Sequence, residues 1–197
     1  MKRALVVALI VGSFSSAQAD DKKGGGKSAP ADKAAMGPPK AAPEFVAATK
    51  YFIGSWKCDG KMAAGPWGPE APATTKLGFK MEMNDFFMAI DGDQKTMGAQ
   101  PMTMTFRGMN GYDPMTKKFM RNDYDSMGGY VAFSSPGWEG DKMVFNGDGM
   151  MMGQKMKLRH TMTKRGDTEF TSTFEVIGPD GKVMPMGEDV CKRAAKR

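Results

Sequence analysis

The sequence is poor in the residues and motifs on which most enzymes rely. It contains one histidine, His160, and two cysteines. General acid–base chemistry would therefore fall mainly to carboxylates, and no pair of these has a distinctive spacing. A zinc-protease motif, a phosphate-binding loop and a nucleophile elbow are all missing from the sequence. These absences favour a non-enzymatic role.

The sequence also lacks an apolar run of the roughly 20 residues that a membrane-spanning helix needs. Two basic residues precede a short apolar stretch at 4–11, and Ala17-Gln18-Ala19 has the small-x-small pattern of a signal peptidase site. Residues 1–19 are therefore expected to be a secretory signal peptide. Residues 20–43, rich in Lys, Gly, Ala and Pro, predict a disordered linker. The folded domain is expected at 44–197 of a periplasmic or secreted protein.

Neither sign of charge dominates the chain. Removing Lys2 and Arg3 with the predicted signal peptide leaves 26 of the 28 basic side chains against 22 acidic ones. These charges are mixed along the sequence, whereas a nucleic-acid-binding module needs a concentrated basic patch. We therefore expect a solvated outer face and no nucleic-acid partner.

After a short apolar approach at 44–51, which predicts one or two helical turns, the sequence alternates as β-strands do. In the stretch 76–83, for example, the apolar side chains from Leu77 to Met83 alternate with polar or small ones and are expected to point inward. Turn residues recur at roughly ten-residue spacing, which is typical of an all-β sandwich or barrel. Closure would remove the exposed edges of such a sheet. We predict an all-β fold, an antiparallel up-and-down barrel of about ten strands after a short N-terminal helical turn.

Several short motifs recur in the order and spacing of one bacterial family. Through them, from residue 45 to residue 190, the chain resembles the family catalogued as domain of unknown function 1579, which looks related to lipocalin-like (calycin) barrels. The resemblance implies a lipocalin-like fold and no particular reaction, because the family has no assigned activity or catalytic residues. The matching motifs are Phe52-Ile53-Gly54-Ser55-Trp56, Gly111-Tyr112-Asp113, Lys117-Lys118-Phe119, Asp125-Ser126-Met127 and Gly178-Pro179-Asp180-Gly181-Lys182.

Methionine is unusually frequent, with 21 residues, and many of them fall at inward positions of the predicted strands. Methionine is flexible and polarizable, so it serves either as filler for irregular gaps in a core or as the lining of an adaptable cavity. The second alternative predicts a protein that binds a small apolar or amphipathic molecule without a cofactor. Its candidate ligand-binding residues are Trp56, Phe79, Met81, Met102, Met104, Phe106, Met156, His160, Met162 and Phe170.

His160 leaves a second hypothesis open, because it shares a strand face with Met156 and Met162. Thioethers select Cu(I), and imidazole also suits copper and haem iron. A periplasmic Cu(I)- or haem-binding protein with these three residues as metal ligands is therefore the alternative function. Against it, the methionines are spread over many strands, and an inward histidine can simply be a hydrogen-bonded core residue.

One strand carries a set of charged residues whose direction the pattern leaves open. Arg121, Asp123 and Asp125 lie in phase with Phe119. Facing inward, they would form a polar patch that orients a ligand head group. Facing outward, they would form a charge cluster at the strand end, with Asp125 capping the turn at 127–129.

The two cysteines invite a disulfide in an oxidising compartment. Cys58 lies in the first predicted strand and Cys191 in the last, and these strands are neighbours in a closed barrel. Cys191 is out of phase with the apolar Val190, so the pairing requires a bulge, for which Gly187 is a candidate. The alternative is two separate thiols.

Overall fold

The computed structural model describes residues 39–66, 68–99 and 101–195. The predicted signal peptide, most of the predicted linker and Trp67 therefore lie outside the described residues. In the part of the chain that is described, no helix is both long and apolar enough to cross a membrane.

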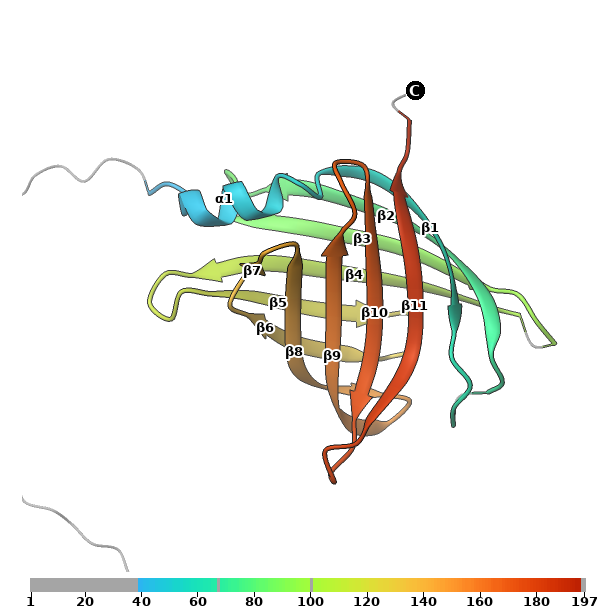
Figure 1. The fold of residues 1–197 in the computed structure, drawn as a ribbon. Coiled ribbons are helices and arrows are strands. Elements are labelled where there is room, and N and C mark those ends of the chain that lie inside the picture. Colours follow the sequence, from blue (N-terminus) through green and yellow to red (C-terminus); the bar gives the residue numbers. More distant parts are fainter. Residues whose placement is uncertain (1–38, 67, 100, 196–197) are drawn as a thin grey trace, which may run out of the picture. The chain divides into compact units, whose positions relative to one another are not determined.

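The described chain contains one short helix, and eleven strands follow it (Figure 1). The helix begins at Pro43, one residue before the predicted start of the folded domain, and Pro is favoured in a first helical turn. The elements are α1 (Pro43–Thr49), β1 (Gly54–Met62), β2 (Ala71–Glu82), β3 (Phe87–Thr96), β4 (Met102–Asp113), β5 (Lys118–Asp125), β6 (Tyr130–Ser135), β7 (Trp138–Glu139), β8 (Lys142–Met151), β9 (Gln154–Lys164), β10 (Glu169–Ile177) and β11 (Val183–Arg193).

Ten of the strands close into an antiparallel barrel, which confirms the predicted fold class. The order β6-β5-β4-β3-β2-β1-β11-β10-β9-β8 follows the chain except where β1 meets β11, and β6 pairs with β8 to complete the ring. The two-residue β7 pairs only with β8, outside this ring. Each strand thus has a partner on both sides, so the main-chain groups of the barrel have no open edge.

The barrel has a dry inner face because apolar and polar side chains alternate along its strands. In β1, Trp56 and Cys58 are buried, while Lys57 and Asp59 are exposed. In β9, Leu158 is buried between exposed or half-buried neighbours. The same alternation places most of the large apolar side chains of the chain inside the barrel.

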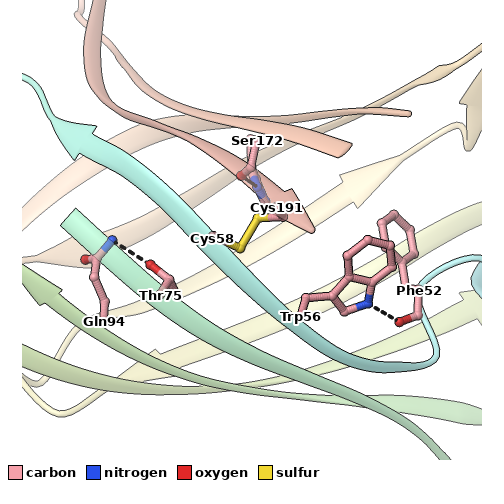
Figure 2. The surroundings of a disulfide bond; sticks show 8 residues. Phe52, Trp56, Cys58, Thr75, Gln94, Ser172 and Cys191 are labelled. Carbon is pink, nitrogen blue, oxygen red and sulfur yellow. Dashed lines mark hydrogen bonds between the residues drawn. A yellow bond between two sulfur atoms is a disulfide. The ribbon is translucent and has the colours of Figure 1, made fainter. Parts of the chain in front are cut away.

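Cys58 and Cys191 form a disulfide across the seam between β1 and β11, as predicted. They face each other directly in the strand register (Figure 2). In β11 the register shifts by one residue at Met186, since Phe174 pairs with Gly187 whereas the next residue of β10 pairs with Pro185. This bulge resets the phase of the strand, so that Cys191 points into the barrel. Val190 consequently points outward and is 41% exposed.

Aromatic side chains fill the end of the barrel at which β1 and β5 begin. The buried Trp56 donates its indole N–H to the carbonyl oxygen of Phe52 at 2.7 Å, and Phe52 stacks on Trp138. Arg193 lies over the Trp56 ring at 4.3 Å and donates to the carbonyl oxygen of Tyr51 at 2.6 Å. Helix α1 covers the same end, because Trp138 donates to one of its carbonyl oxygens.

Candidate functional site

The interior of the barrel contains a cavity of about 270 Å³. Its wall is mainly apolar, and nine methionines contribute to it. These methionines come from both halves of the barrel, so flexible thioether side chains line several sides of the space. They are Met62, Met102, Met104, Met127, Met151, Met152, Met156, Met162 and Met186.

The cavity reaches the surface at the end opposite the aromatic plug. β1 and β5 begin at the plug, and their last residues, Met62 and Asp125, line the cavity. Several lining side chains beside the β5–β6 and β8–β9 turns are exposed to solvent. Tyr124 is 59% exposed and Met152 is 61% exposed, for example. Because the same side chains face both the cavity and water, they form its mouth.

A buried charged group lies in the cavity wall. The side chain of Arg121 is only 4% exposed, and its Nη2 lies 3.0 Å from Oδ2 of Asp123. The guanidinium lies 4.6 Å from the centroids of both the Phe133 and the Phe145 rings. The charge is therefore held by one carboxylate and two aromatic faces. Burial raises the pKa of Asp123, and the charge of Arg121 opposes that rise.

These contacts decide between the two orientations that the sequence left open. Arg121 and Asp123 point inward, so an outward charge cluster is wrong for both residues. Asp125 lines the cavity mouth and also caps the following turn, as its outward alternative predicted. Its Oδ1 accepts hydrogen bonds from the backbone N–H groups of Met127 and Gly129 at 2.8 and 2.9 Å.

His160 connects Arg121 to the opposite wall of the cavity. Its Nδ1 lies 2.8 Å from Nη2 of Arg121, and its Nε2 lies 2.7 Å from Oγ of Ser172. A guanidinium can only donate, so Nδ1 must accept and the proton of the neutral ring must reside on Nε2. Burial, and then the nearby charge of Arg121, hold the pKa of His160 well below its usual range.

The geometry of His160 does not favour the copper or haem alternative. Metal coordination needs a free nitrogen lone pair, whereas Nδ1 accepts from Arg121 and Nε2 carries a proton. Met156 and Met162 line the same cavity as His160. Within the described residues, no group of three or more His, Cys, Asp or Glu side chains is placed to hold a metal ion.

Eight of the ten candidate ligand-binding residues line the cavity, and binding by them remains a prediction. The other two, Trp56 and Met81, lie toward the plugged end. Trp56 belongs to the plug, and the sulfur of Met81 is 3.6 Å from the hydroxyl of Thr49 at the end of α1. The eight lining residues are Phe79, Met102, Met104, Phe106, Met156, His160, Met162 and Phe170.

Two polar lining residues were not among the sequence candidates. Ser172 lies between Phe170 and Phe174 on the inner face of β10, so its phase was a usable signal. Asp189 is in phase with Cys191, but the bulge in β11 concealed which face of that strand is inward. Burial, together with the charges of Asp59 and Glu188, raises the pKa of Asp189 to about 6.

Comparison with known proteins identifies the family and the fold of the chain. A family model described as "Protein of unknown function (DUF1579)" matches residues 47–193. The crystal structure of Rv2717c from M. tuberculosis superposes with a TM-score of 0.59 at 12% identity, covering 79% of this chain and 100% of that one. An S-type phycobiliprotein lyase, CPES from Guillardia theta, gives 0.47 at 8% identity, covering 75% and 91%. No curated protein matched the sequence.

Proposed function

The chain belongs to the DUF1579 family, and we propose that this member binds a small apolar or amphipathic molecule inside its barrel. The observation that carries the proposal is the cavity of about 270 Å³, lined by methionine and phenylalanine side chains and open at one end. A barrel whose side chains filled its interior would offer no such space. Moving an apolar molecule from water into this space would release about 25 cal/mol per Å² of its apolar surface.

The volume sets the size of the ligand. An engineered protein cavity of about 150 Å³ binds benzene. By that standard, this cavity suits a molecule on the order of ten to twenty non-hydrogen atoms. One or two fused rings or a medium-length chain would fit, and a polar group could remain at the mouth.

The proposed role is non-enzymatic. A serine next to a histidine suggests nucleophilic catalysis, but the pair Ser172–His160 is arranged the wrong way round. Since Arg121 donates to Nδ1, Nε2 is protonated and cannot accept the proton of the serine hydroxyl. The histidine therefore cannot act as a general base toward Ser172.

We also propose that the protein works in the periplasm or outside the cell. The disulfide between the first and last strands supports this location, because such bonds persist in oxidising compartments. The signal-peptide pattern of the N-terminal sequence points the same way.

A fluorescent probe tests the proposed binding. N-phenyl-1-naphthylamine is neutral, and its emission rises in an apolar site. It should bind the purified protein, and Met156→Trp should weaken binding at least tenfold because the indole would occupy part of the cavity. Lys157→Trp, which adds the same side chain at the next, exposed position of β9, should bind as the wild type does. Failure of the wild type to bind, or equal binding by both variants, would contradict the proposal.

A further inference from the structure

Three side chains in the cavity wall form a chain of hydrogen bonds with a fixed direction. It begins at Arg121, whose guanidinium has donors and no acceptor. His160 accepts at Nδ1 and is thereby left with its proton on Nε2, which it donates to Oγ of Ser172 at 2.7 Å. Every bond in the chain therefore points from the buried charge toward the serine.

The last member of this chain has a proton to spare. Ser172 accepts from His160, so its own O–H must donate elsewhere, and no described residue accepts from it. Ser172 lines the cavity beside the disulfide (Figure 2), with its side chain on the inner face of β10. The O–H is thus a donor facing an apolar space. Because a guanidinium and a protonated imidazole nitrogen precede it, this donor is polarised.

The charges around the cavity argue against an anionic ligand. Two cationic side chains line it, Lys61 and Arg121, and four acidic ones accompany them. Arg121 already pairs with Asp123 at 3.0 Å, and Lys61 pairs at the mouth with Glu188 at 3.6 Å. The remaining acidic groups would repel a carboxylate, so the acceptor that Ser172 meets should be uncharged. These groups are Asp125 and Asp189.

We propose that the cavity selects an uncharged apolar molecule that carries an acceptor oxygen, such as a ketone, an ester or an amide, and that Ser172 donates a hydrogen bond to this oxygen. The proposal rests on the proposed function, since it specifies the ligand of the same cavity. It makes Ser172 a specificity-determining residue, because a ligand without an acceptor leaves a buried donor unpaired.

Three probes of one shape separate the possibilities. These are 2-acetylnaphthalene, 2-isopropylnaphthalene and 2-naphthoate, which have the same number of non-hydrogen atoms. They offer, in turn, a neutral acceptor, no acceptor and a charged acceptor. Dissociation constants would be measured by titration for the full mature protein, for Ser172→Ala, and for Thr173→Ala, which alters the next residue of β10 on the outer face. Circular dichroism would establish that both variants fold.

Ser172→Ala should weaken binding of 2-acetylnaphthalene about five- to tenfold, which is the usual loss for one hydrogen bond. It should leave 2-isopropylnaphthalene within twofold, and Thr173→Ala should change neither probe. Wild-type protein should bind 2-naphthoate more weakly than 2-acetylnaphthalene. An unchanged ketone affinity in Ser172→Ala, or tighter binding of the carboxylate, would overturn this inference while apolar binding stood. If the wild type bound none of the three probes, the proposed function itself would fall.

Discussion

Asp189 is a carboxylate that the fold holds at a cost, and replacing it should stabilise the protein above neutral pH. Its pKa is raised to about 6 from an ordinary value of 3.8, first by burial and then by the charges of Asp59 and Glu188. One pKa unit corresponds to about 1.4 kcal/mol, so the full shift amounts to roughly 3 kcal/mol. Because the side chain is only half-buried, we expect about 2–3 kcal/mol in practice.

The pH dependence has a definite sign. Below pH 4 Asp189 is protonated in both the folded and the unfolded chain and costs nothing. Between pH 4 and pH 6 the unfolded chain loses this proton before the folded protein does, so the free energy of unfolding falls as the pH rises. Above pH 6 the whole cost is present. Asp189→Asn should therefore be more stable than the wild type by about 2–3 kcal/mol at pH 7.5 and equal to it at pH 3.5.

Urea unfolding of both proteins across this pH range measures the difference directly, since the other carboxylates contribute equally to each. Asp148→Asn, at an exposed position of β8, is the matched control and should differ from the wild type by less than about 0.5 kcal/mol at every pH. The reasoning is refuted if Asp189→Asn gains nothing at pH 7.5, or if its gain is the same at pH 3.5.

Three further substitutions test what holds the barrel and the cavity together, each by urea unfolding. Replacing Cys58 and Cys191 by Ala should remove about 2–5 kcal/mol, because the disulfide closes a loop across a sequence separation of 133 residues. Asp123→Ala should cost about 3–5 kcal/mol, because it leaves the buried Arg121 without its carboxylate. Gly92→Ala should cost about 1–3 kcal/mol and weaken probe binding, because the new methyl group would collide with a phenylalanine ring that lines the cavity.

Each of these has an internal control. Reducing the wild-type disulfide should reproduce the loss caused by the double cysteine variant. Asp91→Ala breaks an exposed ion pair with Arg107 and should cost less than about 1 kcal/mol, so an equal loss in Asp123→Ala would deny the buried pair its importance. Gly78→Ala meets only an ordinary contact and should be tolerated; if Gly92→Ala were equally stable, the predicted collision would be absent.

The alternation of side chains was enough to predict the barrel, and it failed where strands end. Met83 continues the inward pattern of β2 in sequence, but it is 64% exposed. It lies in the turn after the strand, where it and the next two residues all adopt positive φ angles. An alternating pattern carries no mark of the residue at which a chain leaves the sheet, so apolar residues next to a turn are easily placed on the wrong side.

The apolar lining was predictable, and the polar chain inside it was not. Phase alone placed Met156, Met162 and His160 on one face of β9, and all three line the cavity. The contact between His160 and Arg121 joins β9 to β5, which are not neighbours in the sheet. Such a contact across the interior depends on barrel curvature and side-chain length, and no local sequence pattern encodes these.

Native mass spectrometry of the mature protein, isolated from cells without added ligand, tests the central claim most directly. The account predicts a non-covalent adduct small enough for a cavity of about 270 Å³. This adduct should disappear on denaturation and be absent from Met156→Trp, while Lys157→Trp retains it. An adduct that Met156→Trp keeps would place the ligand elsewhere. A bare mass in the wild type, together with no uptake of N-phenyl-1-naphthylamine, would contradict a ligand-binding barrel.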